Sequence, residues 1–304
     1  MTIGRFAPSP TGPLHLGSLV AAVGSWLAAR AAGGKWLVRI EDLDTPRVVP
    51  GSEKEILDAL ERYGLEWDGG IVRQSERIAL YDEALTKLRG AGLVYDCACS
   101  RSELQRAASA PSGAEPAYPG TCRLGIAARR SARAIRFRVP EDPIAFTDAV
   151  FGRIEERVSD QTGDFIVRRA DGPYAYQLAV VVDDAEQGIT QVARGADLLT
   201  STARQIALQR ALGLATPEYL HLPLVVAESG SKISKRDGAL PLPSLSETRV
   251  RQTLRLALRV LGVDVDLGSP EEMLRQAVGC FDPAAIPSRT VSIRLFGETP
   301  SPND

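Results

Sequence analysis

The stretch TIGRFAPSPTGPLHLGSLVAAVGSWLAARAAGGKWLVRI, residues 2–40, decides the fold. It starts with a short apolar run at residues 2–7 and continues through a loop rich in proline and glycine. From Leu16 the apolar residues recur at three- and four-residue spacing, which predicts a helix, and Gly33-Gly34 ends it. Residues 36–40 predict the next strand. A strand, a tight loop, a helix and a second strand in this order favour a parallel α/β sheet.

The same reading of periodicity and turn residues predicts the elements of the remaining chain. We expect a helix that opens with the capping box Ser52-Glu53-Lys54-Glu55 and another that is capped at Ser269 and Pro270. Residues 107–120, rich in Ala, Ser, Pro and Gly, predict a surface insertion. Further helices are expected at 75–88, 201–212, 246–262 and 271–280, and strands at 134–139, 146–158, 164–170, 174–182, 189–194 and 220–226.

The composition narrows the class of protein. A chain of 304 residues with 44% hydrophobic residues can bury a full core. A formal charge of −2 argues against a protein that binds nucleic acid with its whole surface. A local basic patch remains compatible with this charge. We find neither a secretory signal pattern nor an apolar run long enough to span a membrane. The chain is therefore expected to be cytoplasmic, with no membrane partner.

Two separated segments carry the residues needed to hold a polyphosphate. His15 and Gly17 lie where the first loop becomes a helix, and the free N–H groups at a helix start favour a phosphate. The segment Ser231 to Arg236 adds two ammonium groups, Lys232 and Lys235. Taken alone, His15 is more simply read as a helix cap and the lysine segment as a solvated basic turn. Their combination predicts a site for a nucleotide triphosphate and for charge that develops at its α-phosphate.

Three of the four cysteines lie close together in the sequence, at Cys97, Cys99 and Cys122. In a reducing compartment such a group suggests a structural zinc site before a disulfide. The alternative is that the three behave as small apolar residues. Cys280 falls on the apolar face of a late helix, and we expect it in the core.

Taken together, the segments Pro13 to Ser18 and Ser231 to Arg236 resemble the HIGH and KMSKS signatures of class I aminoacyl-tRNA synthetases. Arg5 to Gly12 and Arg39 to Asp44 narrow the resemblance, which covers roughly residues 1–240, to the glutamyl group. One departure is Ser18, which stands where the second histidine of HIGH would be. The resemblance implies an α/β fold: a Rossmann-type parallel-sheet catalytic domain with a zinc-binding insertion and a short helical C-terminal region. The implied divisions are 1–95 and 191–240 for the two catalytic halves, 96–190 for the insertion with its connecting strands, and 241–304 for the C-terminal region.

The resemblance also implies roles for individual residues. Chemically, Glu41 can pair an α-ammonium, Arg5 or Arg194 can hold a carboxylate, and Tyr176 can donate a hydrogen bond. By resemblance, L-glutamate is bound by Arg5, Phe6, Ala7, Pro8, Ser9, Glu41, Tyr176 and Arg194. ATP, with Mg²⁺ on its phosphates, is bound by His15, Gly17, Ser18, Lys232 and Lys235, of which His15, Lys232 and Lys235 are catalytic. One structural Zn²⁺ is bound by Cys97, Cys99, Tyr118 and Cys122.

Too few residues follow Arg236 for the helical region with which discriminating glutamyl-tRNA synthetases read the anticodon stem. The chain therefore resembles the short glutamyl-queuosine tRNA(Asp) synthetase family. This implies activation of glutamate by ATP without tRNA, transfer to the queuosine base in the anticodon of tRNA(Asp), and a monomer. Three alternatives stay open: a glutamyl-tRNA synthetase that charges the acceptor end, a catalytically weakened tRNA-binding paralogue, and a small-molecule nucleotidyltransferase.

Overall fold

The computed structural model describes residues 1–100, 102–103, 117–227, 242 and 245–293. Its strands are β1 (Ile3–Phe6), β2 (Lys35–Ile40), β3 (Val72–Arg73), β4 (Val94–Cys97), β5 (Ala134–Phe137), β6 (Ile144–Asp148), β7 (Gly152–Glu156), β8 (Ile166–Arg168), β9 (Gln191–Gly195), β10 (Glu218–Leu222), β11 (Val225–Ala227) and β12 (Val291–Ile293). Its α-helices are α1 (Leu16–Ala31), α2 (Ser52–Arg62), α3 (Ile78–Gly90), α5 (Val158–Gln161), α6 (Tyr176–Glu186), α7 (Thr202–Leu212), α8 (Glu247–Val260) and α9 (Pro270–Cys280). Short 3-10 helices are η1 (Thr45–Arg47), η2 (Gln74–Glu76), η3 (Ala196–Ser201) and η6 (Pro283–Ala285).

Two sheets meet at the centre of the molecule. In one, β1, β2 and β3 pair in parallel, and in the other β9, β10 and β6 pair in parallel, with β7 antiparallel at the edge. Strands β1 and β9 lie side by side. The backbone N–H of Thr190 donates to the carbonyl of Ile3 at 3.0 Å, just before β9 begins. The chain runs from β1 outward to β2, and from β9 outward to β10 in the other direction. This reversal creates a crevice at the carboxyl ends of β1 and β9, the usual ligand position in such sheets.

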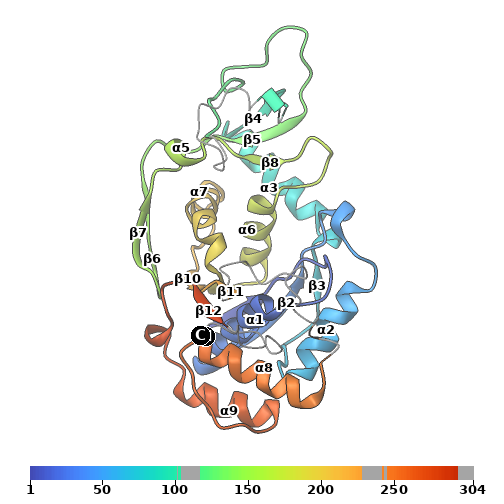
Figure 1. Cartoon of the computed structure of the whole chain (residues 1–304). Coiled ribbons are helices and arrows are strands. Elements are labelled where there is room, and N and C mark those ends of the chain that lie inside the picture. Colours follow the sequence, from blue (N-terminus) through green and yellow to red (C-terminus); the bar gives the residue numbers. More distant parts are fainter. Residues whose placement is uncertain (101, 104–116, 228–241, 243–244, 294–304) are drawn as a thin grey trace, which may run out of the picture.

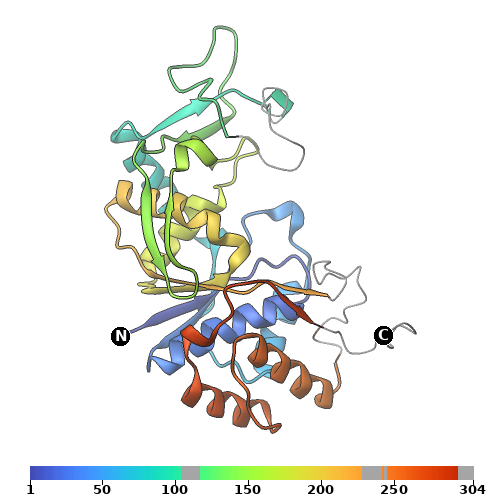
Figure 2. The ribbon, with the colours of Figure 1, turned by 60° about the vertical axis from the view of Figure 1, so that its left-hand side comes forward.

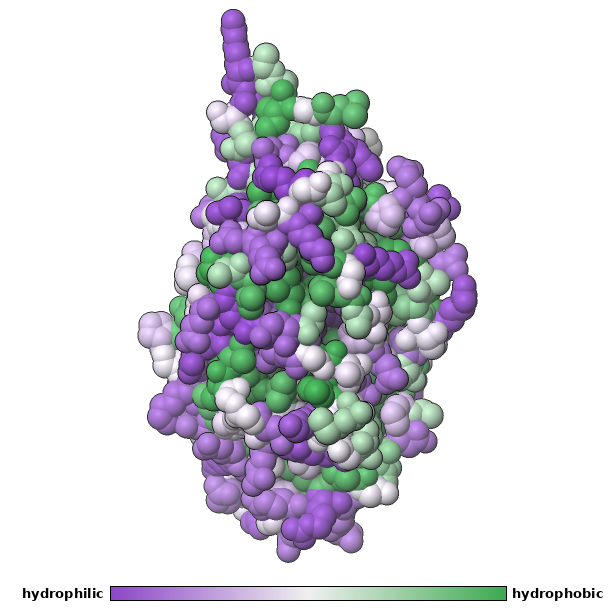
Figure 3. All heavy atoms as spheres, turned by 180° about the vertical axis from the view of Figure 1, so that it is seen from behind, coloured by the Kyte–Doolittle hydropathy of each residue, from purple (hydrophilic) through white to green (hydrophobic). Residues whose placement is uncertain are grey.

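Helices cover both faces of these strands. Figure 2 shows α1, α8 and α9 below the strands and the helices α6 and α7 above them. One apolar core joins α1 to α8 and α9, and a second joins α3, α6 and α7. The antiparallel sheet β4-β5-β8 lies at the far end of the molecule (Figure 1). Seen from behind, hydrophilic residues are interspersed with hydrophobic ones over the surface (Figure 3), which suits a chain of nearly balanced charge.

The structure confirms the predicted α/β class with a parallel sheet, and it corrects several predicted elements. The strand predicted at 174–182 is wrong, because Tyr176–Glu186 forms helix α6. Its residues Leu178 to Asp183 are all buried. Because Leu178 to Val182 is an unbroken apolar run, it has no periodicity that separates a strand from a helix. The strand predicted at 146–158 is the hairpin of β6 and β7, and that at 220–226 is interrupted after Leu222, where Pro223 follows, giving β10 and β11.

The two predicted helix caps have different outcomes. Ser269 forms the expected capping box with Glu272, and Pro270 is the first residue of α9. The box predicted at Ser52 is wrong: Gly51 is the N-cap of α2, with a φ of 82°, and makes no side-chain cap. The Ser52 hydroxyl instead contacts Gly12, donating to its carbonyl and accepting from its N–H, both at 2.9 Å. Ser52 therefore fastens the first loop to α2.

Four further findings concern Cys280, the C-terminal residues, the predicted insertion and the length of the helices. Cys280 is exposed, so its predicted place in the core is wrong. Residues 291–293, in a tail without periodicity, form β12 because they pair in parallel with β11. Most of the predicted surface insertion, residues 107–116, lies outside the described residues. No helix among the described residues is long and apolar enough to cross a membrane.

Candidate active site and metal centre

A cavity of about 880 Å³ opens at the carboxyl ends of β1 and β9, against the N-terminus of α1. Six of the predicted binding residues line it, and five of these belong to the loop and helix start that follow β1. Gly195, the last residue of β9, and Asp197, in η3, line another side. The six predicted residues are Phe6, Pro8, Ser9, His15, Gly17 and Ser18. A cavity of this volume is of the size that holds a nucleotide.

His15 is the N-cap of α1, as the simpler sequence interpretation expected. Its Nδ1 accepts a hydrogen bond from the backbone N–H of Ser18 at 3.2 Å. A Cβ atom on Gly17 would lie 3.1 Å from Cε1 of the His15 ring, so glycine there lets the ring fold closely against the helix start. His15 thus caps the helix and also lines the cavity. Lys232 and Lys235 lie outside the described residues.

Arg5, on β1, is buried in a cluster of charged groups. Its Nε donates to Asp184 Oδ1 at 3.1 Å and its Nη2 to Asp184 Oδ2 at 3.4 Å. The fully buried Arg39 also pairs with Asp184, at 2.8 Å. Burial alone would raise the pKa of Asp184, but Arg5 and Arg39 hold it below its ordinary value. The carboxylate-binding fork predicted for Arg5 therefore already has a carboxylate partner within the chain.

Glu41 follows β2 at the edge of this cluster. Its backbone N–H donates to the carbonyl of Pro8 at 2.9 Å, which holds the loop after β1 beside the end of β2. Its carboxylate lies 3.3 Å from Arg39. Burial nevertheless raises the pKa of Glu41 above its ordinary value, against the opposing effect of Arg39 and Arg5. A further cation beside Glu41 would favour its ionised form.

Arg194, on β9, is surrounded differently. Its Nη1 donates to the Tyr176 hydroxyl at 3.4 Å and to Gln205 Oε1 at 2.7 Å. Its Nη2 donates to the Thr202 hydroxyl at 2.9 Å. Among the described residues no carboxylate lies within ion-pair distance of Arg194, which is 6% exposed. This is a buried guanidinium whose hydrogen bonds go to neutral groups, and it can receive an anion.

The predicted amino-acid residues therefore converge from β1, β2, β9 and α6. Arg5 Nη1 lies 3.4 Å from the carbonyl of Ala193, next to Arg194, so the two arginine clusters adjoin. Gly195, the next residue, lines the cavity. Arg5, Glu41, Tyr176 and Arg194 lie beside the cavity and are not among its lining residues, nor is Ala7, which follows β1.

The sequence interpretation missed the groups that hold these side chains. Asp183 and Asp184 on α6 are buried: Asp184 pairs with Arg5, and Asp183 accepts from Arg77 Nε at 2.6 Å. Two adjacent acids that follow an apolar run were the available signal. His221, one of only two histidines, is fully buried beside Arg194. It lies in an ordinary apolar strand, so the sequence alone carries no signal for it. The other missed members are Arg39, Asp148, Thr202 and Gln205.

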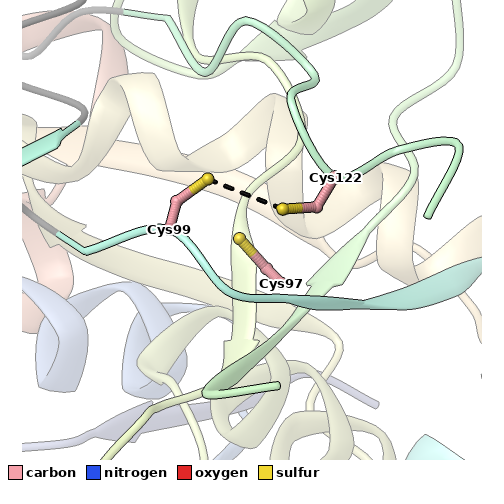
Figure 4. A group of neighbouring side chains, drawn as sticks. All are labelled: Cys97, Cys99 and Cys122. Atoms are coloured by element: carbon pink, nitrogen blue, oxygen red, sulfur yellow. Dashed lines mark hydrogen bonds between the residues drawn. The ribbon is translucent and has the colours of Figure 1, made fainter. Parts of the chain in front are cut away.

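The three clustered cysteines converge on one point from two segments (Figure 4). The Sγ atoms of Cys97, Cys99 and Cys122 all lie within 4.8 Å of one another, and those of Cys99 and Cys122 are 3.6 Å apart. The hydroxyl of Tyr118 lies 3.6 Å from Cys97 Sγ and 3.7 Å from Cys99 Sγ. Ligands at about 2.3 Å from a tetrahedral zinc would be about 3.8 Å apart. The four predicted ligands therefore fit such an ion.

One arginine borders this centre. Arg136 is buried, its Nε donates to Cys97 Sγ at 3.3 Å, and its guanidinium lies 3.7 Å from the centre of the Tyr118 ring. Gly163 approaches the backbone of Tyr118 so closely that a Cβ there would lie 2.5 Å from the carbonyl oxygen, and its φ is 64°. Tyr118 is thereby held against the thiol group, with a positive charge beside it.

Residues 2–273 match the family model described as tRNA synthetases class I (E and Q), catalytic domain. A protein named glutamyl-Q tRNA(Asp) synthetase from Geobacter sulfurreducens is 54% identical over 294 residues, covering 94% of each chain. One of the same name from Thiobacillus denitrificans is 55% identical over 260 residues, covering 86% of this chain and 85% of the other. The crystal structure of glutamate-tRNA synthetase from Elizabethkingia anophelis superposes with a TM-score of 0.79 at 27% identity, covering 96% of this chain and 68% of that one.

Proposed function

Because this chain belongs to the class I tRNA synthetases of the glutamate and glutamine group, we propose that it activates L-glutamate with ATP and transfers it to the queuosine base of tRNA(Asp). The observation that carries the proposal is the buried Arg194, with no carboxylate among its described neighbours, beside a nucleotide-sized cavity. The relatives of more than half identity carry the name that describes this activity.

The nucleotide half of the site is the cavity at the start of α1. The free N–H groups and the positive end of a helix dipole favour phosphate oxygens there, and Gly17 leaves room for them beside His15. Mg²⁺ on the phosphates would neutralise part of their charge. Lys232 and Lys235 are proposed to approach from the other side of the triphosphate. Ser18 offers a hydroxyl where the family has a second histidine.

The amino-acid half of the site binds two charged groups of glutamate, the α-ammonium and the side-chain carboxylate. The α-ammonium pairs with Glu41, whose raised pKa reflects a buried carboxylate that another cation would stabilise. The side-chain carboxylate goes to Arg194 and the Tyr176 hydroxyl, 3.4 Å from each other. Glutamine would leave the buried charge of Arg194 without an anion, which explains a preference for glutamate. Arg5, already paired with Asp184, orders the end of β1 and contributes positive charge nearby.

Two chemical steps follow from this placement of ATP and glutamate. First, an oxygen of the glutamate α-carboxylate attacks the α-phosphorus of ATP, and pyrophosphate leaves. His15, the helix start and the two lysines stabilise the charge that grows on the phosphate. Second, a hydroxyl of queuosine attacks the glutamyl carbonyl, an ester bond forms, and AMP leaves. The adenylate phosphate is proposed to accept the proton of that hydroxyl.

The basic surface needed for tRNA lies in the insertion. Residues 117–139 contain six arginines and no acidic residue. Arg129 and Arg133 are exposed there, whereas Arg136 is buried at the metal centre. We propose that the exposed arginines contact phosphates of tRNA(Asp), which would make binding salt-dependent. Zn²⁺ bound by Cys97, Cys99, Tyr118 and Cys122 would fix the base of this surface.

The test has two stages. Exchange of labelled pyrophosphate into ATP should require L-glutamate and no tRNA. Labelled glutamate should then be transferred to tRNA(Asp) that carries queuosine, and not to tRNA(Asp) lacking it or to tRNA(Glu). Transfer to tRNA(Glu) would instead support charging of the acceptor end. Absence of exchange would support a tRNA-binding paralogue without activity.

A further inference from the structure

His221, on β10, lies between a buried cation and a buried anion. Its Nε2 accepts from Arg194 Nε at 3.1 Å, and its Nδ1 lies 2.6 Å from Asp148 Oδ2. The side chains of His221 and Asp148 are both 0% exposed. Parallel pairing of β6 with β10 brings Asp148, the last residue of β6, beside His221. The three residues form a continuous path from Asp148 to the amino-acid site.

The hydrogen bonds assign the protonation state of this path. Asp148 is ionised, since burial would raise its pKa but His221 and the amides of Phe151 and Val150 lower it below the ordinary value. A carboxylate only accepts, so Nδ1 of His221 carries the proton and Nε2 is left as an acceptor for Arg194. Burial, together with the charge of Arg194, lowers the pKa of His221 below its ordinary 6.5. The imidazole is therefore neutral at pH 7.

The neutral ring keeps two opposite charges apart. Asp148 is satisfied without Arg194: Oδ1 accepts from the amides of Val150 and Phe151, each at 2.9 Å, and Oδ2 from the amide and ring of His221. Thr202 completes the arrangement, since its hydroxyl accepts from Arg194 and lies 3.3 Å from His221 Nε2. Arg194 is consequently oriented on every side without being neutralised. Without the ring between them, Asp148 could pair directly with Arg194 and cancel its charge.

We propose that His221 determines substrate specificity: as a neutral spacer between Asp148 and Arg194, it reserves the guanidinium charge for an amino acid whose side chain is anionic. This rests on the proposed function and deepens it. His221 touches Arg194 and is a positioning residue. Its effect is on the choice between glutamate and glutamine, which carry a carboxylate and a neutral amide on otherwise equal side chains.

The decisive double variant moves the negative charge from position 148 to position 221 without changing the total charge of the two residues. In Asp148→Asn/His221→Glu the carboxylate stands next to Arg194 instead of behind the imidazole. We expect the ratio of kcat/KM for glutamate to that for glutamine, measured by pyrophosphate exchange, to fall at least a hundredfold, mainly through the KM for glutamate. The matched control, Asp148→Asn/His221→Gln, keeps a neutral acceptor beside Arg194. Its glutamate-to-glutamine ratio should stay within about tenfold of the wild-type ratio. A charge-transposed variant that discriminates like the wild type would overturn the proposal.

A conservative variant covers failure of the double variant to fold, which thermal denaturation would reveal. Asp148→Asn alone removes the anion behind the ring. If His221 separates the charges, the glutamate-to-glutamine ratio should change less than about threefold, and a rise above tenfold would overturn the proposal. Wild-type enzyme without glutamate-dependent exchange would refute the proposed function instead. An active wild type whose Asp148→Asn/His221→Glu variant keeps the wild-type ratio would refute only the role of His221.

Discussion

Arg5 and Arg194 lie on the adjacent strands β1 and β9 and are equally buried, at 3% and 6% exposure, yet their surroundings differ in kind. Arg5 is bound by the carboxylate of Asp184, which Arg39 shares. Arg194 is bound by hydroxyl, amide and imidazole groups, all neutral. A buried cation is expensive without an anion. The difference supports our proposal that Arg5 completes the scaffold and that Arg194 is kept for a ligand.

Arg136, in the insertion, extends the comparison. It is also buried and has no carboxylate within ion-pair distance among the described residues, and it faces Cys97 and the ring of Tyr118. A zinc ion with three thiolates carries a net negative charge. Arg194 would thus receive its counter-charge from glutamate, a ligand, and Arg136 from thiolates of this chain that lose their protons when the metal binds.

The largest effect should follow from Arg194→Gln. Removing the cation that receives the side-chain carboxylate should lower kcat/KM for glutamate on the order of a thousandfold, about 4 kcal/mol. The melting temperature should change little, because no internal carboxylate loses its partner. Glutamate-dependent pyrophosphate exchange and thermal denaturation measure the two quantities. Arg210→Gln, at an exposed position of α7, is the control. A folded variant with a much lower melting temperature but an unchanged kcat/KM for glutamate would reverse the comparison.

Arg5→Gln should show the opposite pattern. Asp184 would lose one of its two cations in a buried site, so the free energy of unfolding should fall by about 3 kcal/mol. Urea denaturation measures this. Adding Asp184→Asn should restore part of the loss, since the uncompensated carboxylate is then gone. A loss under about 0.5 kcal/mol, the range of ordinary surface substitutions, would contradict the scaffold role.

Arg136→Gln should weaken zinc binding by about 10- to 100-fold, as is usual when a group that supports a metal ligand is removed. The variant loses the positive charge and the hydrogen bond beside Cys97. Competition with a chromogenic chelator measures the affinity. Arg138→Gln, whose guanidinium covers Tyr95 rather than a predicted ligand, should leave it unchanged. Equal affinities for Arg136→Gln and the wild type would show that the thiol group needs no such charge.

The raised pKa of Glu41 predicts a pH dependence. Protonation removes the charge that pairs with the α-ammonium, so kcat/KM for glutamate should fall, at most about tenfold per pH unit, as pH drops through that pKa. The decline should begin above pH 4.5, the ordinary value for a glutamate. Arg39, Arg5, Asp184 and Asp183 are the charged groups that act on it. Glu41→Gln should have low activity and lack this decline. A wild-type profile that is flat down to pH 4.5 would argue against the pairing.

The smallest effect is expected for Tyr176→Phe. Arg194 keeps Gln205, Thr202 and His221, so only the contacts of one hydroxyl are lost and KM for glutamate should rise about fivefold, about 1 kcal/mol. Tyr174→Phe is the matched control, because its hydroxyl bonds Asp82 and not Arg194. An unchanged KM in Tyr176→Phe would remove the hydroxyl from the amino-acid site.

Much of the site could be predicted because its residues fall in recognisable segments. Residues 2–40 have clear periodicity, and β1, α1 and β2 follow it closely. The spacing of three cysteines suggests a shared site, to which the resemblance adds the ligand set, and the structure brings the three Sγ atoms together. The predictions that failed concern residues whose structure depends on contacts with residues distant in the sequence. Residues 178–184 of α6 are all buried, so this part of the helix has no period that distinguishes it from a strand. Asp184 and His221 acquire their roles through contacts with Arg5 and Arg194, which are distant from them in the sequence.

A crystal structure with a non-hydrolysable glutamyl-adenylate analogue tests the proposed roles of Arg5 and Arg194 most directly. We predict the adenosine in the cavity at the N-terminus of α1 and the side-chain carboxylate within hydrogen-bond distance of Arg194 and Tyr176, with Arg5 still paired to Asp184. A side-chain carboxylate bound by Arg5, with Asp184 displaced and Arg194 contacting no ligand atom, would contradict it.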